Sequence, residues 1–525
     1  MKNKTVPFLI FILYILHLGT AMAQDRPNIL FIMTDDHTQK ALHAYGQGLL
    51  DTVYFPNMNR LAKEGALFRN SFVTNSICAP SRAVLLTGKY SHLNGKVDNV
   101  GPFDWSQMTY PKLLRDAGYE TALIGKIHLS GKPQGYDYSL TLPDQGNYYN
   151  PEFIRNGVEE LKFEGHCEVL IPEFVVDWLE NVWDRGKPFA INYHTKAPHR
   201  NWMPEEKYLN LYEDIEFEFP HNFFDAYSGR GRAAKEQEME ILNDMFWGWD
   251  MKFKKNPFTG EPSRLQAPFG RMTKEQMQAW NDVYGPTNEA FLKEMPTGEE
   301  LAKFKFHRYL RDYLKVVKSV DDGIGKVLDY LEAEGLLDKT LVIYTSDQGF
   351  YLGEHGWYDK RFMYEQSLST PLLVRYPKEI KPGTVVNEMV MNLDHAPTIL
   401  EYAGLAIPSE MQGKSWRTLA SGGTLPWRDA IYYHYYEYPG PHMVKRHYGV
   451  RTDRYKLIHF YYDVDEWEMY DLKNDPDEMN SIYNDPNYAD IKKSLHTRLE
   501  ELRVEYGDSD ELNRQFIEKS VSKNN

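Results

Sequence analysis

The chain has 525 residues, a formal net charge of −15, and 42% hydrophobic and 26% charged residues. This length exceeds what one simple core needs and predicts a large domain with a smaller one beside it. The composition excludes a disordered or collagen-like chain, and the negative charge disfavours nucleic acid as a partner.

The first residues predict a secretory signal peptide over 1–23. Two lysines in residues 1–4 precede an apolar run at 6–18, and Ala21-Met22-Ala23 forms a small-residue cleavage site. A membrane anchor is the alternative, but the run is short and ends in this cleavage-like site. No later segment is long and apolar enough to cross a bilayer. We therefore expect a secreted or periplasmic protein.

Four short apolar runs predict buried strands at residues 26–34, 121–125, 188–193 and 340–345. Helical patterns lie between them, the clearest with apolar side chains along one face of residues 310–331. Strands that are apolar on both faces and separated by helices favour an α/β fold with a doubly wound, largely parallel sheet. In such folds, ligands bind at the edge where the strands end.

Changes in the pattern of apolar and polar residues along the chain predict two domains after the signal peptide. Residues 24–425 form the expected catalytic domain, in which the polar stretch 204–297 is interpreted as a helical insertion. Residues 426–525 form an expected C-terminal α+β subdomain. Its predicted strands and final helix lie at 432–438, 448–462 and 488–506.

The sharpest motif surrounds Cys78, which precedes a Pro80-Ser81-Arg82 turn that leads into a helix. The amino end of a helix and a nearby arginine favour negative charge on a group held there. A buried structural cysteine is the alternative interpretation. The pattern C-x-P-S-R followed by L-T-G resembles the formylglycine-dependent (type I) sulfatase family of the alkaline phosphatase superfamily.

This resemblance implies that a maturation enzyme oxidises Cys78 to the aldehyde formylglycine, which leaves Cys167 unpaired. A thiolate attacking sulfur would leave a stable adduct. A hydrated aldehyde instead attacks with one hydroxyl, and loss of the second hydroxyl's proton then expels sulfate and restores the carbonyl. This is covalent catalysis with its own release step.

Two acidic segments follow predicted strands. Asp35 and Asp36 end the first strand, and Asp347 and Gln348 follow a later one. Taken singly, each segment is more often a turn or a helix cap. Adjacent carboxylates repel each other unless a cation lies between them, and oxygen ligands suit Ca²⁺ better than Zn²⁺, although Mg²⁺ stays possible. In the order that sulfatases use, these four residues and Cys78 are interpreted as one metal site.

The resemblance also implies roles for five basic side chains. Arg82, Lys126 and Lys360 are expected to hold the formylglycine and the sulfate oxygens. His128 would handle the proton of the geminal hydroxyl, and His199 would protonate the leaving alcohol oxygen. Fixed cations aimed at developing negative charge lower the barrier, and histidine titrates near neutral pH.

The substrate is expected to be a sulfated glycan. Asp359 and Arg361 flank Lys360, so they could hydrogen-bond sugar hydroxyls, with a local ion pair as the alternative. Together with the donor-rich stretch 442–452, these residues resemble the N-acetylglucosamine-6-sulfatase branch, which acts on glycosaminoglycans or mucin glycans. The resemblance implies that His447 reaches the sugar.

Three alternatives stay open. The enzyme could have another sulfatase specificity, such as that of a uronate-2-sulfatase or an arylsulfatase. The same scaffold could hydrolyse phosphomonoesters or phosphonates, because a fold does not determine a reaction. A catalytically silent glycan-binding protein is a different class, but it would be expected to lack the nucleophile or the metal acids, and neither is missing.

Overall fold

The computed structural model describes residues 26–46, 48–263 and 269–524. The predicted signal peptide at residues 1–23 lies outside the described residues. Among those described, none of the helices combines the length and the apolar character that a bilayer crossing requires.

A large mixed sheet forms the centre of the molecule. In the part of the chain that the structure describes, it has ten strands in the order β11-β2-β10-β9-β1-β8-β4-β5-β6-β7. The strands from β9 to β5 run parallel, whereas β10, β6 and β7 pair antiparallel with their neighbours. The strands of this sheet are β1 Asn28–Thr34, β2 Ala66–Phe68, β4 Glu120–Lys126, β5 Tyr138–Leu142, β6 Glu152–Arg155, β7 Glu159–Lys162, β8 Phe189–His194, β9 Thr340–Ser346, β10 Leu372–Arg375 and β11 Thr384–Val386.

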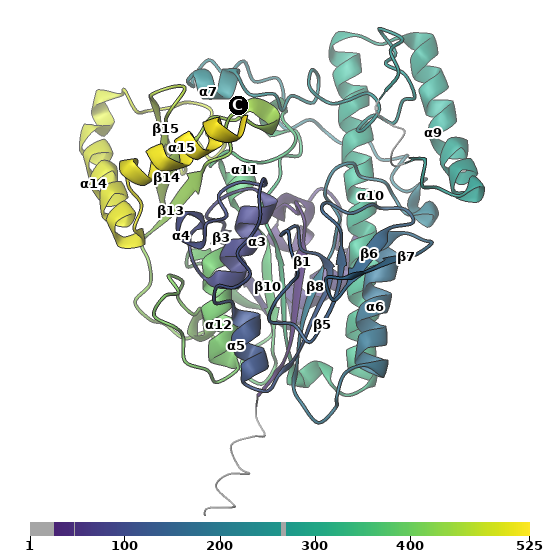
Figure 1. The fold of residues 1–525 in the computed structure, drawn as a ribbon. Coiled ribbons are helices and arrows are strands. Elements are labelled where there is room, and N and C mark those ends of the chain that lie inside the picture. The colour runs from purple at the N-terminus through teal and green to yellow at the C-terminus, as the bar shows by residue number, and fades with distance from the viewer. Residues whose placement is uncertain (1–25, 47, 264–268, 525) are drawn as a thin grey trace, which may run out of the picture.

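Helices cover both faces of this sheet, as Figure 1 shows. The side chains on the two faces of the sheet pack into different hydrophobic cores, because successive side chains of a strand point in opposite directions. Leu30 and Ile32 of β1 pack in one core with side chains of α6 and α10, whereas Ile29 and Phe31 pack in the other with α3 and α12. The helices are α2 Pro56–Glu64, α3 Cys78–Thr87, α4 Ser91–Asn94, α5 Tyr110–Asp116, α6 Cys167–Asn181, α7 Arg232–Lys235, α9 Lys274–Glu294, α10 Gly298–Ala333, α11 Glu365–Leu368, α12 His395–Tyr402, α13 Arg417–Ala420, α14 Ala489–Tyr506 and α15 Asp510–Asn524.

A second, antiparallel sheet lies beside the first and belongs to the C-terminal part of the chain. Its order is β13-β14-β15-β16, and α14 packs against it. A short parallel pair, β3 with β12, completes the sheets of the described residues. The strands outside the large sheet are β3 Ser71–Phe72, β12 Val390–Met391, β13 Ala430–Tyr435, β14 His447–Thr452, β15 Tyr455–Phe460 and β16 Glu466–Asp471.

These elements confirm the predicted α/β class, with its largely parallel sheet and a smaller α+β part. The four predicted core strands are β1, β4, β8 and β9, and the amphipathic pattern at 310–331 lies within α10. The stretch 204–297 differs from the predicted helical insertion, because α9 is the only long helix among its described residues. Residues 204–263 and 269–273 fold mainly as turns and loops, in which proline and glycine interrupt helical hydrogen bonding.

Candidate active site

Four oxygen-bearing side chains meet where two neighbouring parallel strands end. Asp35 and Asp36 follow β1, Asp347 and Gln348 follow β9, and the register pairs Thr34 with Ser346. The backbone N–H of Asp36 donates to Oδ1 of Asp347 at 3.1 Å. One carboxylate oxygen from each of the three aspartates lies within 4.8 Å of the other two. The predicted acids therefore form one buried cluster.

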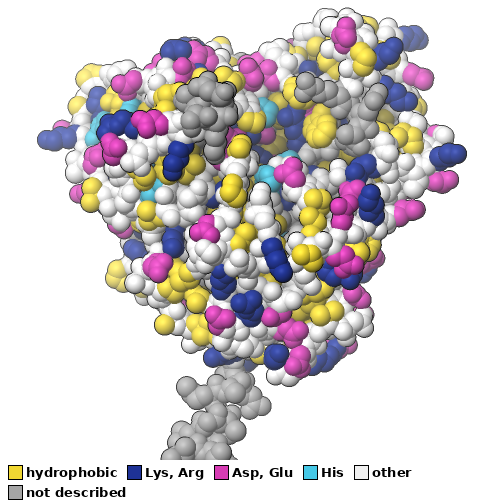
Figure 2. Space-filling view, in the orientation of Figure 1, with side chains coloured by type: hydrophobic (Ala, Val, Ile, Leu, Met, Phe, Trp, Pro, Cys, Tyr) yellow, Lys and Arg dark blue, Asp and Glu magenta, His cyan; other side chains and the backbone are white. Residues whose placement is uncertain are grey.

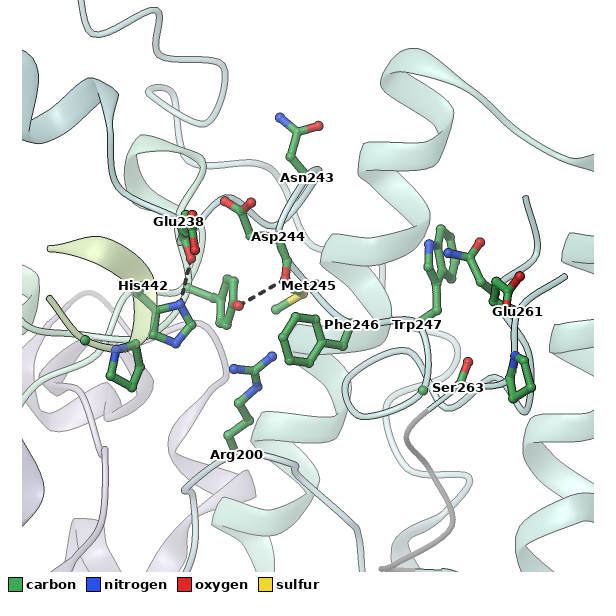
Figure 3. A pocket seen from close by; sticks show the side chains of 16 residues that line it. Arg200, Glu238, Asn243, Asp244, Met245, Phe246, Trp247, Glu261, Ser263 and His442 are labelled. Atoms are coloured by element: carbon green, nitrogen blue, oxygen red, sulfur yellow. Dashed lines mark hydrogen bonds between the residues drawn. The ribbon is translucent and has the colours of Figure 1, made fainter. Parts of the chain in front are cut away.

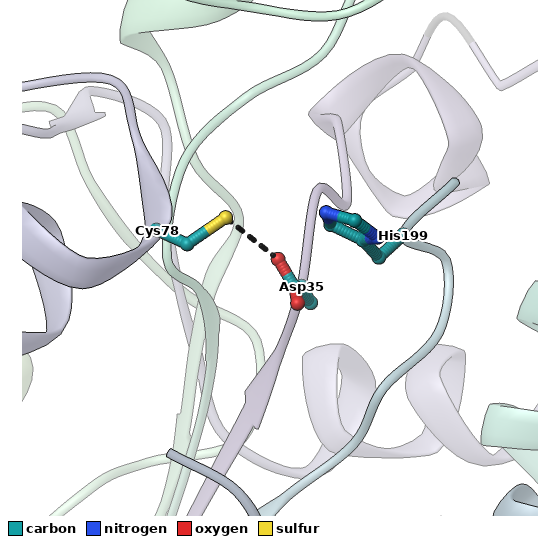
Figure 4. A group of neighbouring side chains, drawn as sticks. All are labelled: Asp35, Cys78 and His199. Atoms are coloured by element: carbon teal, nitrogen blue, oxygen red, sulfur yellow. Dashed lines mark hydrogen bonds between the residues drawn. The ribbon is translucent and has the colours of Figure 1, made fainter. Parts of the chain in front are cut away.

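Cys78 begins α3 and points into this cluster, as Figure 4 shows. Its Sγ lies 3.4 Å from Oδ1 of Asp35, 3.7 Å from Nε2 of Gln348 and 3.6 Å from Nζ of Lys360. The side chain is 1% exposed, and Cys167 is likewise buried and free. The structure thus brings Cys78 and the predicted metal acids together.

Arg82 lies one turn further along α3, on the same helix face as Cys78. Its Nε and Nη2 each lie 2.9 Å from Oδ2 of Asp347, and Nη1 donates to the carbonyl oxygen of Lys126 at 2.6 Å. The guanidinium is fully buried. It connects the ends of β9 and β4 and neutralises one of the aspartates.

Two lysines complete the basic set. Lys126, the last residue of β4, pairs with Asp35 and donates to Oε1 of Gln145 at 2.5 Å. Lys360 donates to both carboxylate oxygens of Asp36, at 2.6 and 2.7 Å. Each aspartate of the cluster therefore has its own cationic partner.

His128 lies at the edge of this set. Nε2 of Gln145 lies 3.0 Å from Nε2 of His128, and the Oδ1 atom of Asp144 lies 3.4 Å from the same ring nitrogen. Burial lowers the pKa of His128 to about 4. Sequence reasoning missed Gln145, which bridges Lys126 and His128. Its position in the loop after β5 places it at the edge where the strands end, so strand recognition there would have indicated it.

His199 faces Asp35 from the side opposite Cys78 (Figure 4), and the residue is only partly exposed. Its Nδ1 lies 2.6 Å from the carbonyl oxygen of Arg200. Because a carbonyl only accepts, Nδ1 carries a hydrogen and Nε2 is left for the site. Burial and the charge of Lys126 hold the pKa of His199 well below its ordinary value.

Glu168 positions the loop that carries His199, and sequence reasoning gave no sign of it. Its Oε1 accepts from the backbone N–H groups of Lys196 and Ala197, at 3.0 and 2.8 Å. The side chain is 1% exposed. It acts on the site through the backbone, which leaves no motif in the sequence.

The three carboxylates of the cluster differ in their pKa values. Burial opposes the ionisation of Asp35, but Lys126 and the other nearby cations hold its pKa well below the usual value. Burial raises the pKa of Asp36 to about 6, and burial with the charge of Asp35 raises that of Asp347 to about 7. Carboxylates that repel each other in this way are stabilised by a cation between them.

The donor set fits a hard divalent cation. It consists of three carboxylates and one amide, all oxygen donors of the kind that Ca²⁺ and Mg²⁺ prefer. Gln348 is fully buried, its Nε2 donates to Asp36, and its Oε1 has no hydrogen-bond partner among the described residues. A buried oxygen without a partner is explained by a ligand that it binds.

The predicted sugar-binding residues lie close to the cluster, with one exception. Nε of Arg361 donates to Oδ1 of Asp359 at 3.0 Å, and Nη1 of Arg361 donates to Oε1 of Glu437 at 2.9 Å. His442, which the prediction did not single out, lies with its Nε2 3.3 Å from Oδ2 of Asp359. Asp359, Arg361 and His442 all have positive φ, a backbone strain that clusters at functional sites.

His447 is the exception, since the structure does not bring it to the surface of the site. It is fully buried, its Nε2 accepts from the backbone N–H of Met363 at 3.0 Å, and its Nδ1 lies 2.8 Å from the carbonyl oxygen of Lys445. Its ring stacks on Phe362 and Tyr433. Both ring nitrogens are engaged, so His447 supports the core of the second sheet.

Two clefts open beside the cluster, and Figure 2 shows this face of the molecule hollowed between two lobes. A cleft of about 400 Å³ is lined by Gln145, Lys196, His199 and Arg200 among others. A cleft of about 770 Å³ shares Arg200 with it and extends past Tyr358 and His442. The site is therefore accessible to a ligand larger than a single anion.

A buried nucleophile position, an acidic cation site and converging basic side chains define a hydrolase for anionic esters. The sulfatase family model matches residues 27–405, and the model named N-sulphoglucosamine sulphohydrolase, C-terminal, matches residues 353–505. An N-acetylglucosamine-6-O-sulfatase of Bacteroides thetaiotaomicron is 48% identical over 493 residues, which cover 92% of this chain and 88% of that protein. The human N-acetylglucosamine-6-sulfatase is 27% identical over 447 residues, covering 79% of this chain and 68% of the human protein.

A solved structure agrees over nearly the whole chain. It is described as a complex with a substrate, D-glucosamine-2-N,6-O-disulfate, and superimposes with a TM-score of 0.89 at 47% identity. The match covers 93% of this chain and 99% of the other. The chain therefore belongs to the sulfatase family and is a sulfuric ester hydrolase. This confirms the resemblance predicted from the Cys78 motif.

Proposed function

We propose that this enzyme removes the 6-O-sulfate of N-acetylglucosamine residues in glycosaminoglycans or mucin glycans. The observation that carries the mechanism is the position of Cys78, whose Sγ lies 3.4 Å from Asp35 inside the acidic and basic cluster. The sugar assignment is supported by the 48% identical N-acetylglucosamine-6-O-sulfatase and by the similar structure whose described substrate carries a 6-O-sulfate.

In this proposal residue 78 is formylglycine, formed by a separate maturation enzyme. Burial and the negative charge of Asp35 raise the pKa of the unmodified thiol far above its usual range. An unmodified Cys78 is therefore protonated at neutral pH and a poor nucleophile. Formylglycine supplies an oxygen nucleophile and a route for releasing sulfate.

One Ca²⁺ is the proposed metal, held by Asp35, Asp36, Asp347, Gln348 and residue 78. When bound, it supplies a Lewis acid beside the nucleophile. The three carboxylates and the unpartnered Oε1 of Gln348 support this assignment.

The basic side chains bind the anion in the proposed mechanism. Arg82 fixes the orientation of Asp347 and, together with the lysines, holds the formylglycine. Lys126 and Lys360 hold sulfate oxygens, where a fixed positive charge stabilises the charge that develops as the ester bond breaks. His199 donates a proton from Nε2 to the leaving alcohol oxygen once the negative charge of the bound sulfate ester has raised the pKa of the ring and protonated it. His128 handles the proton of the nucleophile's second hydroxyl.

The sugar lies against Asp359 and Arg361, which accept and donate hydrogen bonds to its hydroxyls. His442 orients Asp359, because the two side chains are 3.3 Å apart. Residues 24–425 form the catalytic domain, and residues 426–525 form the C-terminal subdomain that supplies His442. The proposed location is outside the cytoplasm, after cleavage of the signal peptide at residues 1–23.

The test uses the enzyme produced together with a maturation enzyme, and a Cys78→Ala variant as the control. Mass spectrometry of the peptide spanning residue 78 should detect the aldehyde. On a panel of monosaccharides sulfated at single positions, sulfate release should be fastest from 6-sulfated N-acetylglucosamine and absent in the variant. An intact thiol in active enzyme would contradict the nucleophile. Faster release from a 2-sulfated uronate, an aryl sulfate or an aryl phosphate would contradict the substrate.

A further inference from the structure

The larger cleft leads away from the sulfated sugar's contacts into the 204–297 segment. Its volume is about 770 Å³, within the range of pockets that enclose whole ligands and large enough for more than one sugar ring. At its near end Tyr358 precedes Asp359, and His442 contacts Asp359. At the other end lie Trp247 and Glu261, as Figure 3 shows. The cleft therefore adjoins the proposed sugar site and extends away from it.

An exposed aromatic ring forms part of the wall of this cleft. Phe246 is 54% exposed although it belongs to the cleft lining. The guanidinium of Arg200 lies 4.9 Å from the centroid of the Phe246 ring and 5.0 Å from that of Tyr358. Asp250 fixes Arg200 with two hydrogen bonds, at 2.6 and 2.5 Å. Arg200 thus covers one face of the ring, and the exposed remainder of Phe246 offers an apolar surface that the apolar face of a pyranose can cover.

The charge of the cleft is negative. Glu238, Asp244 and Glu261 line it, and Arg200 is the only lysine or arginine among the described lining residues. Asp250 already pairs with that arginine. Burial and the charge of the nearby glutamates raise the pKa of Asp244, as expected where carboxylates gather. A sugar that carries a carboxylate or a second sulfate would meet like charge here.

We infer that this cleft binds the sugar residue next to the sulfated one and favours an uncharged sugar over a uronate or a sulfated sugar. The inference rests on the proposed function, since it places the 6-sulfated sugar against Asp359. It assigns two tasks to one surface. Phe246 binds the neighbouring ring by stacking, and Glu238, Asp244 and Glu261 disfavour anionic neighbours.

The experiment compares kcat/KM for three substrates. They are 6-sulfated N-acetylglucosamine alone, the same sugar joined to an uncharged hexose, and the same sugar joined to a uronate, with both linkage directions prepared. The variants are Phe246→Leu, which keeps bulk against Arg200 but removes the ring, and Phe246→Trp, which restores a flat surface. Phe224→Ala is the matched control, because Phe224 is 59% exposed in the same segment but lies outside the cleft lining.

The ratio of kcat/KM for the uncharged disaccharide to that for the monosaccharide should exceed one in the wild type. It should fall about three- to tenfold in Phe246→Leu and be retained in Phe246→Trp and Phe224→Ala. The triple variant Glu238→Gln, Asp244→Asn and Glu261→Gln should improve the uronate disaccharide relative to the uncharged one. Each rate is compared with the monosaccharide rate of the same variant, which corrects for misfolded protein.

A ratio unchanged in Phe246→Leu would overturn the subsite, and equal turnover of the two wild-type disaccharides would overturn the charge preference. Failure of the proposed function looks different. The wild type would then not hydrolyse 6-sulfated N-acetylglucosamine, and the same ratios would be measured on whichever sulfated monosaccharide it does hydrolyse.

Discussion

Replacing Lys360 with methionine tests whether the acidic cluster holds a cation. Nζ of Lys360 donates to both carboxylate oxygens of Asp36, at 2.6 and 2.7 Å, and the residue is 3% exposed. Lys360→Met keeps the length of the side chain and removes its charge. In protein stripped of divalent cations, Asp36 would then face Asp35 and Asp347 without its partner.

The expected loss depends on whether a cation is bound. Breaking a buried ion pair from one side costs about 3–5 kcal/mol, because the remaining charge is uncompensated. In the presence of Ca²⁺ the metal compensates Asp36, and the remaining loss should be that of a volume-conserving exchange, below about 1.5 kcal/mol. The difference between the two conditions, about 1.5–5 kcal/mol, therefore reports cation binding at the acids.

Urea unfolding midpoints at pH 8, measured with chelator and with Ca²⁺, provide the assay. Lys456→Met is the matched control, because this buried lysine of β15 lies outside the cluster and its Nζ is 2.6 Å from Glu478 and 2.9 Å from Glu365. Its loss should be equal in both conditions. If Lys360→Met also loses the same stability with and without Ca²⁺, the three aspartates do not form a cation site and the assignment is refuted.

Three further perturbations follow from single contacts. Glu168→Ala removes the acceptor of two backbone N–H groups before His199. The variant should lower the free energy of unfolding by about 1–3 kcal/mol and reduce kcat more than it changes KM. An unchanged kcat would exclude a positioning role for Glu168. His442→Ala should raise KM with little effect on stability, whereas His447→Ala should lower the free energy of unfolding by about 2–3 kcal/mol. The reverse pattern would contradict the placement of His442 at the site and of His447 in the core. Burial raises the pKa of Glu478 from 4.5 to about 7. The folded protein therefore holds this proton more tightly than the unfolded chain, so this contribution to stability is complete below pH 4.5 and is lost as the pH rises to about 7. Glu478→Gln should flatten this part of the unfolding profile, and an unchanged profile would refute the shift.

The central strands could be predicted because each is buried on both faces and reads as an apolar run. β1 and β9 are buried along their whole length, so their sequences carry the signal without any tertiary information. The strands at the edge of the sheet lack this apolar pattern. β7, Glu159–Lys162, is exposed at three of its four residues and reads as a polar loop. Its strand conformation comes from pairing with β6, which a local pattern does not encode.

The site residues that could be predicted from the sequence are those in motifs that directly follow a predicted strand. Asp35, Asp347 and Lys126 converge because the strands that carry them are neighbours or near neighbours in a parallel sheet. His442 and His447 could not be separated in this way, because both lie in one donor-rich stretch. His447 starts β14 and faces inward, whereas His442 lies before the strand, in the short 3-10 segment Pro441–Met443. The position where the strand starts, and not composition, therefore separates the two histidines.

The balance of charge in the cluster explains how an acidic protein can act on an anion. Three carboxylates are matched by three basic side chains: Asp35, Asp36 and Asp347 by Lys126, Lys360 and Arg82. When all three carboxylates are ionised, this arrangement has no net charge with which to attract a sulfate ester. A divalent cation bound by the acids would add two positive charges and would compete with the lysines for the carboxylates, which would free Lys126 and Lys360 to bind sulfate oxygens. The overall charge of −15 opposes this only weakly, since surface charges are screened beyond about 10 Å. In the proposed mechanism, affinity for the anion would therefore depend on cation binding at the ends of β1 and β9.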